Sequence, residues 1–230
     1  MQAGLRPVVR MPAAGRMSDR VHEELLSAIR DLRLEPGAVL SETDLSVRLG
    51  VSRTPLRETI SRLVDQGLLR VVSQVGTSVA LIDMAAVEEA CFIRSALETA
   101  AFQDACSADD LDVTGLRAIL GRQEHAVASG NADAFFDADE ALHQEIFRLG
   151  GHPGVWSVVR RSKVELDRLR RLILPEAIAT RDLIDEHTRI VDLLAERDVQ
   201  QGVEIIHRHS RHVLRQAADV RLRHPDYFVP

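Results

Sequence analysis

The chain has 230 residues, of which 45% are hydrophobic and 3% aromatic, and it carries a formal net charge of −6 at pH 7. This length allows two ordinary domains, the shortage of aromatic residues disfavours a sheet-rich sandwich or barrel, and the negative charge argues against a protein that simply coats nucleic acid. The charge is uneven, because residues 1–82 carry 11 arginines and 9 acidic residues, whereas residues 83–230 carry 18 basic and 26 acidic residues. A weakly basic first part and an acidic second part predict two domains with different tasks.

The beginning of the chain shows no targeting pattern. Residues 1–17 mix arginine with proline, glycine and alanine and contain no continuous apolar core, so we expect a disordered N-terminal arm rather than a signal peptide. No later stretch is long and apolar enough to span a bilayer. The two cysteines, Cys91 and Cys106, lack the spacing of a zinc ribbon or a disulfide framework. These features predict a cytoplasmic protein that makes no membrane contact.

Residues 18–82 have the pattern of three short helices followed by a β-hairpin. Pro36-Gly37 and Gly50 separate the helices, and the expected N-caps are Ser18, Ser41 (with Asp44 completing a capping box) and Ser52. After Gly67 the hydrophobic period changes to two. Leu69 and Val71 are expected on one side of a first strand, residues 73–76 form a turn, and Val79 and Leu81 belong to a second strand.

The second and third of these helices have the layout of a helix-turn-helix, whose second helix enters the major groove of DNA. Arg53 and Arg57 lie four residues apart on one face, opposite an apolar face, and arginine can contact guanine bidentately or hold a phosphate. Thr54 and Ser61 flank this surface and could bind phosphate oxygens. On their own, two such arginines could equally be ordinary solvent-facing residues.

Residues 20–82 closely resemble the N-terminal domain of the GntR family. The resemblance is carried by the sequence GVSRTPLRE at residues 50–58, by Pro36-Gly37 and LSE at 40–42 before it, and by Leu63 and Gly67-Leu68 after it. The resemblance implies a winged helix-turn-helix in which Arg53 and Arg57 contact operator DNA and Gly76, at the wing tip, approaches the minor groove. Two positions depart from the family pattern. Thr43 and Val75 replace residues that are often basic, so fewer charges are expected to contact phosphate.

From Met84 to Leu222 the period is helical. Interruptions near residues 107–109, 130, 150–153, 175 and 197–198 predict about six helices in an antiparallel all-α bundle. The expected fold is therefore mainly α, with a disordered arm at 1–17, a winged helix-turn-helix of three helices and a hairpin at 18–82, a helical bundle at 83–222 and a tail at 223–230.

Four ionisable residues lie on apolar stripes of this second part. Asp139 and His143 are one turn apart between Phe135 and Phe147, and His187 and His209 each lie among aliphatic residues of later helices. Burial of so many polar groups is costly unless they are paired, and a divalent cation would satisfy all four at once. Each histidine alone could instead be a hydrogen-bonded core residue.

The same arrangement resembles the FCD domain, which forms the C-terminal half of the FadR branch of the GntR family, over about residues 84–222. The matching residues are Asp139 and His143, Glu186-His187, Asp198 eleven residues later, and His209. The resemblance implies that Asp139, His143, His187 and His209 ligate a divalent ion and leave positions open for water or for the carboxylate of an effector. Such ligands suit zinc, nickel, manganese or iron(II), so the residues do not identify the metal.

Arg94 is a further polar residue on an apolar stripe, with Val87, Cys91 and Leu97. A salt bridge to Glu98, one turn later, explains it without any ligand. The resemblance implies instead that Arg94 is an effector-binding residue that helps to hold the carboxylate of a small organic acid, for which a guanidinium fork is well shaped.

Together these features predict a homodimeric repressor that binds a pseudo-palindromic operator in double-stranded DNA and responds to a small organic acid bound near a divalent metal ion. No catalytic residue is expected. Two alternatives remain at this stage: a metal-dependent, hydrolase-like enzyme, and a DNA-binding protein with a purely structural metal that senses no ligand.

Overall fold

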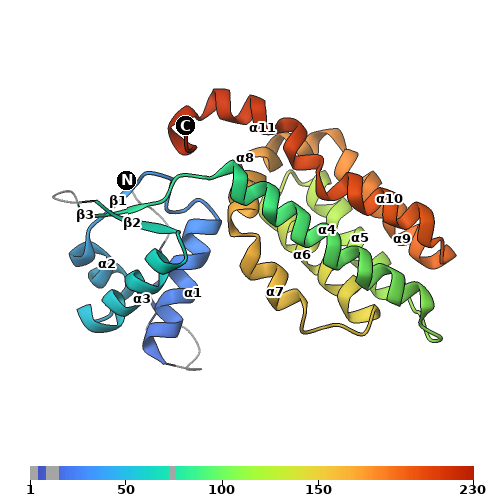
Figure 1. Ribbon diagram of the computed structural model, residues 1–230, viewed down its shortest axis with the longest axis horizontal. Helices are drawn as coiled ribbons and strands as arrows, with labels where there is room; N and C mark the ends of the chain where they lie inside the picture. Colours follow the sequence, from blue (N-terminus) through green and yellow to red (C-terminus); the bar gives the residue numbers. More distant parts are fainter. Residues whose placement is uncertain (1–4, 9–15, 73–75) are drawn as a thin grey trace. The chain divides into compact units, whose positions relative to one another are not determined.

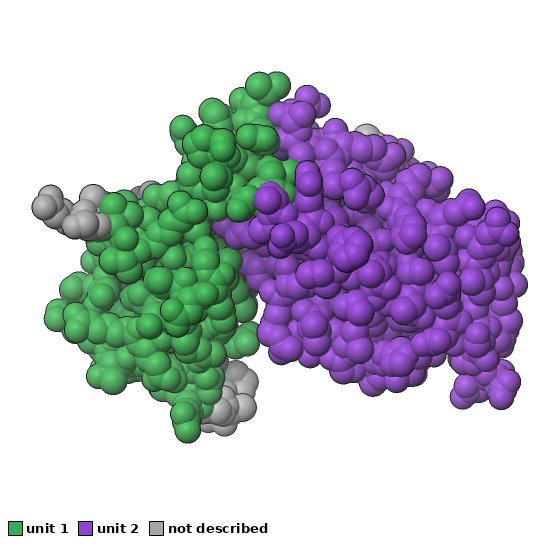
Figure 2. All heavy atoms as spheres, viewed as in Figure 1, with its two compact units in different colours: residues 1–84, 221–230 green, residues 85–220 purple. Residues whose placement is uncertain are grey.

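The computed structural model describes residues 5–8, 16–72 and 76–230. The described chain is mainly α-helical and contains one small antiparallel sheet (Figure 1), which confirms the expected fold class. It divides into two compact units (Figure 2): unit 1 comprises Met1–Met84 and Arg221–Pro230, and unit 2 comprises Ala85–Val220. None of the helices in the described ranges is both long and apolar enough to cross a membrane.

Unit 1 contains the three helices that the sequence predicts. They are α1 (Met17–Arg30), α2 (Glu42–Leu49) and α3 (Arg53–Asp65). Ser41 caps α2, since its hydroxyl accepts a hydrogen bond from the backbone N–H of Asp44 at 3.3 Å, and Gly50 ends α2 in the left-handed conformation with φ of 69°. This turn sets the start of α3.

The expected cap at Ser18 is wrong. Helix α1 begins at Met17, and Ser18 is buried inside its first turn. The reason is packing against α3: the Ser18 hydroxyl donates to the Glu58 carboxylate at 3.2 Å, and the Ser18 carbonyl accepts from the buried hydroxyl of Thr59 at 3.0 Å. These tertiary hydrogen bonds replace the local cap.

The sheet has three strands, β1 (Val39–Leu40), β2 (Leu69–Val72) and β3 (Gly76–Val79), in the order β1-β3-β2. The predicted hairpin is β2-β3, whereas β1 was not predicted because two residues carry no periodic signal. Residues 73–75, including Val75, lie outside the described residues. Leu69 and Val71 both lie in β2, two positions apart as predicted, but Leu69 is buried and Val71 is 71% exposed.

Segments from both ends of the chain pack in unit 1. Val8 is buried, and the backbone N–H of Arg6 donates to the Glu24 carboxylate at 2.8 Å. At the other end, Ile82 and Phe228 form a parallel bridge, with Ile82 N–H donating to the Tyr227 carbonyl at 2.8 Å. Phe228, near the C-terminal end of the chain, is buried.

Unit 2 is a helical bundle. Between Met84 and Arg223, all within the described part of the chain, there are eight helices: α4 (Met84–Ser107), α5 (Thr114–Ala128), α6 (Ala132–Leu149), α7 (Trp156–Ser162), α8 (Val164–Thr180), α9 (Asp182–Glu196), α10 (Val199–Ser210) and α11 (His212–Arg223). Helix α5 packs against α6 and α9, and α9 also packs against α8 and α10. Phe102, Leu142, Phe147 and Ile190 are among the fully buried residues of the core.

The number of helices differs from the expected six for an identifiable reason. Pro175 lies inside α8 instead of ending it, and its exposed position lets solvent replace the backbone hydrogen bond that proline cannot make. Breaks at Lys163, Arg181 and Arg211 carry neither glycine nor proline, so the sequence pattern does not mark them. As a result His209 lies at the end of α10, and not on one continuous last helix.

Candidate functional site

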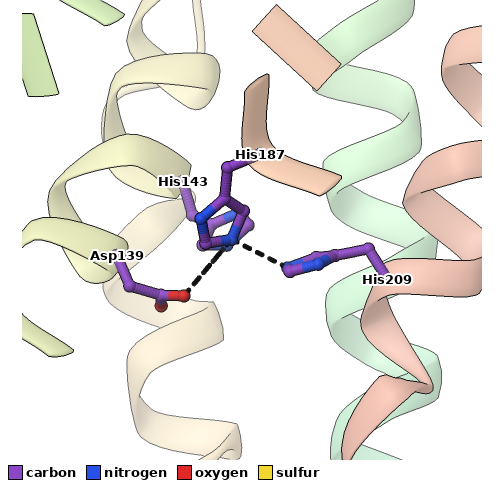
Figure 3. A group of neighbouring side chains, drawn as sticks. All are labelled: Asp139, His143, His187 and His209. Carbon is purple, nitrogen blue, oxygen red and sulfur yellow. Dashed lines mark hydrogen bonds and ion pairs between the residues drawn. The ribbon is translucent and has the colours of Figure 1, made fainter. Parts of the chain in front are cut away.

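The four predicted ligand residues meet in the interior of unit 2. Helix α6 carries Asp139 and His143 one turn apart, α9 carries His187 and α10 carries His209 (Figure 3). One ligand atom from each residue can be chosen so that all four atoms lie within 4.8 Å of one another. All four side chains are buried, with at most 6% of any residue exposed. The structure thus brings together residue types that can bind a divalent cation.

The ring Nε2 atoms face the centre of this cluster. His187 Nε2 lies 3.3 Å from His209 Nε2 and 3.4 Å from Asp139 Oδ1, as the dashed lines in Figure 3 mark, and His143 Nε2 lies 3.9 Å from Asp139 Oδ1. These distances place three imidazole nitrogens and one carboxylate oxygen around a common point.

The other ring nitrogen of each histidine has its own oxygen partner. Nδ1 of His143 contacts the Glu98 carboxylate, Nδ1 of His209 lies 2.9 Å from Glu186 Oε2, and Nδ1 of His187 lies 2.8 Å from Gln123 Oε1. Ionised carboxylates, and the amide oxygen of Gln123, only accept hydrogen bonds, so these contacts place each ring proton on Nδ1 and each lone pair on Nε2. Three lone pairs directed at one point are complementary to a cation.

Asp139 completes the set. Its Oδ2 accepts a hydrogen bond from Arg170, while its buried Oδ1 has no hydrogen-bond partner among the described residues. Burial by itself would raise the pKa of Asp139, but the charge of Arg170, followed by that of His143, holds this pKa well below its ordinary value. The carboxylate is therefore an anion with one oxygen left for a further partner.

Burial also sets the protonation of the imidazoles. It lowers the pKa of His209 to about 4, with Glu186 opposing this shift, and it lowers the pKa of His187 well below its ordinary value, aided by the charge of His209. Burial would raise the pKa of Glu98, but the charges of His143 and Arg94 outweigh it and lower that pKa to about 2. At neutral pH His187 and His209 are neutral, which is the form that binds metal.

This donor set fits a divalent metal ion. Three imidazoles and one carboxylate are typical ligands of zinc and of neighbouring transition metals. Asp139 Oδ1, which has no hydrogen-bond partner among the described residues, is a buried acceptor that a cation would satisfy. The cluster formed by Asp139, His143, His187 and His209 could therefore hold such an ion, whose identity the ligands do not decide.

Arg94 of α4 reaches the same cluster. It is buried, and its Nη2 lies 2.5 Å from His143 Nε2 and 3.1 Å from His209 Nε2. Its Nε also pairs with Glu98 Oε2 at 3.3 Å. The predicted salt bridge to Glu98 is thus present, and the guanidinium also points into the cluster.

A cavity adjoins the cluster. Arg94, Asp139 and His209 line it at the polar end, together with Arg170 and His212. The rest of the wall is mainly aliphatic and comes chiefly from α8: Leu166, Ile173, Leu174, Ala177, Leu183 and Val213. The cavity has a volume of about 30 Å³, so its walls would have to move apart to admit a ligand with its polar group near the cluster and its apolar part along α8.

Sequence reasoning missed two of the residues that support the ligands, Gln123 and Arg170. Both lie on otherwise apolar stripes, Gln123 with Leu116 and Leu120 on α5, and Arg170 near Leu166 and Ile173 on α8. A polar residue on an apolar stripe is the same signal that identified Asp139. Arg170 also pairs with Glu140 at 3.2 Å and with Asp167 at 3.3 Å, so it is held firmly.

The second candidate site lies on unit 1. Arg53, Thr54, Arg57 and Ser61 are all exposed on α3, and the opposite face of this helix is buried through Leu56, Ile60 and Leu63. The first turn of α3 carries no acidic residue, and the positive end of the helix dipole therefore remains favourable for phosphate.

Two details of this surface follow from the structure. Arg57 Nε lies 2.9 Å from Glu42 Oε2, but the Arg57 side chain is still 65% exposed. This ion pair is therefore weak, and another anion can easily replace the Glu42 carboxylate. Gly76 begins β3 with φ of 115°, a conformation that favours glycine. Apart from its chain neighbours, no atom of the described residues lies within 4 Å of the position that a Cβ would take at Gly76. The exposed backbone at Gly76 is open to close approach.

Comparisons with known proteins point the same way. The family model "FCD domain" matches residues 89–212, and the model "Bacterial regulatory proteins, gntR family" matches residues 17–79. The chain is 36% identical to an uncharacterized HTH-type transcriptional regulator in an unstable DNA locus of Streptomyces ambofaciens, over 94% of this chain and 91% of that protein. It is 28% identical to the HTH-type transcriptional repressor RspR of Escherichia coli (strain K12), over 92% of this chain and 93% of that one. Among solved structures, E. coli McbR/YncC matches with a TM-score of 0.74 over 90% of this chain and 99% of that chain, and its 19% identity makes this a likeness of fold alone.

Proposed function

Because this chain belongs to the GntR family of bacterial regulatory proteins and carries an FCD domain, we propose that it is a dimeric repressor whose operator binding responds to a small organic acid held beside a divalent metal ion. Its general role as a DNA-binding transcriptional regulator, and not an enzyme, follows from the family. This removes the hydrolase alternative. A regulator with a purely structural metal remains the rival to effector binding.

One observation carries the metal part of the proposal: the three Nε2 lone pairs of His143, His187 and His209 converge with Oδ1 of Asp139, which has no hydrogen-bond partner in the described part of the chain. These four residues would hold the ion. A bound divalent ion supplies Lewis-acid positions at which a carboxylate oxygen can bind. Glu98, Gln123 and Glu186 orient the imidazoles through their Nδ1 atoms.

The acid would bind in the cavity beside the cluster. Arg94 provides a guanidinium at its polar end, where a charge-assisted hydrogen bond to a carboxylate is strong. The aliphatic wall from α8 favours an acid with an apolar part. Linkage then requires that an acid that weakens operator binding also binds less tightly to the DNA-bound protein, by the same factor.

The DNA part of the proposal assigns roles to the exposed residues of α3. Arg53 and Arg57 would contact bases or phosphates in the major groove, Thr54 and Ser61 would contact phosphate oxygens, and Gly76 would approach the minor groove. A dimer would place two such helices on two half-sites of a pseudo-palindrome in double-stranded DNA. Repression is supported by the name of RspR, a relative along almost the whole chain. Binding to chromosomal DNA would place this regulator in the cytoplasm.

Elemental analysis and melting test the metal site. Purified protein should contain close to one divalent ion per chain, and the His143→Ala/His209→Ala double variant should lose the ion and its stabilisation of the fold. His207→Ala is the matched control, because His207 lies on the same helix as His209 but is exposed. Equal metal content in the wild type and the double variant would show that the ligands are misassigned.

A separate experiment tests the effector. A thermal-shift screen of small carboxylates should find an acid that raises the melting temperature of the metal-loaded protein, since a ligand of the folded state stabilises it. The same acid should weaken binding to DNA from upstream of the gene. If no acid shifts the melting temperature and chelation of the metal leaves DNA binding intact, the metal is purely structural.

A further inference from the structure

Arg94 and a metal ion would compete for the same lone pairs, those on Nε2 of His143 and His209. The Arg94 Nη2 donates toward Nε2 of His143 at 2.5 Å and of His209 at 3.1 Å, and these two atoms belong to the candidate metal ligands. Arginine has no acceptor, so in each contact the imidazole nitrogen must provide the lone pair. Because Nδ1 of both rings already contacts a carboxylate, the lone pair on Nε2 is the one that each ring directs inward.

An imidazole Nε2 has a single lone pair, and it cannot be shared between a guanidinium proton and a metal ion. The two partners are also both cations, so they repel each other inside a buried site where screening is weak. Binding of an ion by His143 and His209 is therefore exclusive of the Arg94 contacts observed.

We propose that Arg94 is a built-in competitor for the metal ligands: its guanidinium occupies the lone pairs of His143 and His209 until an ion displaces it, and only the displaced guanidinium is available to a carboxylate. This inference rests on the proposed function of the cluster as a metal site. If so, the acid can contact Arg94 only after a metal ion has bound. This holds even for an acid that makes no direct bond to the ion.

The surroundings of Arg94 give the displaced side chain a place. Its Nε keeps the Glu98 carboxylate at 3.3 Å, which tethers the guanidinium to α4, and the side chain already lines the cavity along α8. Nη2, once displaced from the imidazoles, would turn toward this cavity, where the acid is expected.

Charge balance favours the same sequence of events. Arg94 pairs with Glu98 and Arg170 pairs with Asp139, so the charges closest to the imidazoles are already matched. A divalent ion adds two positive charges to a buried region, and buried charge is costly without a counter-charge. A carboxylate that reaches both the ion and Arg94 would supply that counter-charge.

The affinity for zinc tests the proposal. We would titrate metal-free wild type, Arg94→Met and Arg94→Lys with Zn(II) against a chromophoric chelator. Arg94→Met keeps most of the side-chain volume but removes the donors, so it should bind Zn(II) about tenfold more tightly than the wild type, or better. Arg94→Lys keeps the charge on a shorter side chain without the guanidinium fork, so its affinity should lie between the two.

A charge control separates competition from simple repulsion. Arg208 lies next to His209, is exposed, and has its Nε 3.9 Å from Glu186, but it makes no contact with an imidazole Nε2. Arg208→Met should therefore change the affinity for Zn(II) by less than about twofold, because exposed charges are screened.

The outcomes are distinct. Equal or weaker Zn(II) binding by Arg94→Met than by the wild type would overturn the competition, while the metal site itself would stand. If neither protein binds Zn(II), the proposed function fails as well. A second test works even if the Arg94→Met variant does not fold. It uses nitrogen-15 spectra of the arginine side chains of the wild type, in which the Arg94 signal is assigned by its absence from the spectrum of Arg94→Lys. That signal should shift on addition of one equivalent of Zn(II), and an unmoved signal with Zn(II) bound would also overturn the proposal.

Discussion

Gln123 offers a sharp test of how the metal ligands are held in place. It is fully buried on α5, its Oε1 lies 2.8 Å from Nδ1 of His187, and its Nε2 has no hydrogen-bond partner among the described residues. The amide thus orients one ligand and contributes little else. Replacing it by leucine, of similar size, removes the acceptor and leaves the apolar neighbours of α5 in contact.

The expected effect on the fold is small. Gln123→Leu leaves the Nδ1–H of His187 without an acceptor, which costs about 1–3 kcal/mol, but it also removes the unpaired Nε2 of Gln123, whose burial carries a penalty of about the same size. These changes oppose each other. The free energy of unfolding of the metal-free protein should therefore change by no more than about 1 kcal/mol.

The expected effect on the metal is large. Loss of the partner that orients a metal-bound histidine lowers metal affinity by about 10- to 100-fold, which corresponds to about 1.4–2.7 kcal/mol. His187 would no longer be held with its lone pair on Nε2, so only Asp139, His143 and His209 would remain well oriented. Chelator competition with Zn(II) measures the affinity, and melting of the metal-free proteins measures the fold.

Gln103→Leu serves as the matched control, because it makes the same chemical change at an exposed position of α4. It should leave both quantities as in the wild type. Unchanged Zn(II) affinity in Gln123→Leu would refute the idea that the amide orients His187. A large loss of stability in the metal-free variant would show that the amide has a structural role beyond its hydrogen bond to His187.

Three further predictions concern other parts of the chain. Arg53→Ala or Arg57→Ala should each cost about 1–3 kcal/mol of operator affinity if the side chain reads a base, and filter binding at several salt concentrations should show a flatter salt dependence if it binds a phosphate. Gly202→Ala should destabilise the fold by about 1–3 kcal/mol, because a Cβ at Gly202 would overlap with the ring of Phe102, and urea unfolding with an unchanged midpoint would contradict this packing. Phe228→Ala should destabilise unit 1 by about 3 kcal/mol, because it removes a buried aromatic ring at the bridge to Ile82. Hydrogen exchange of the backbone amides of unit 1 measures this loss of stability. Unchanged protection in the variant would show that the C-terminal segment does not stabilise unit 1.

The sequence by itself was sufficient to predict that four ionisable side chains of the bundle turn inward. Helical periodicity is a local property, since residues three and four positions apart share a face whatever lies opposite them. Asp139, His143, His187 and His209 each stand on an apolar stripe, and all four are buried in the structure. The capping of α2 by Ser41 and the exposed arginines of α3 were predictable for the same reason, because their causes lie within a few residues.

Tertiary structure alone decided which of these side chains meet. Gln123 reaches His187 across 64 positions of sequence and Arg94 reaches His209 across 115, and no pattern within one helix specifies such pairs. They depend on how α4, α5, α9 and α10 cross, which is set by the packing of the whole bundle. The same holds for two residues of unit 1. Ser18 makes hydrogen bonds with α3 and does not cap α1, and Phe228 is buried beside its bridge to Ile82. Local sequence sets the direction of a side chain relative to the core, and only the packed chain sets its partner.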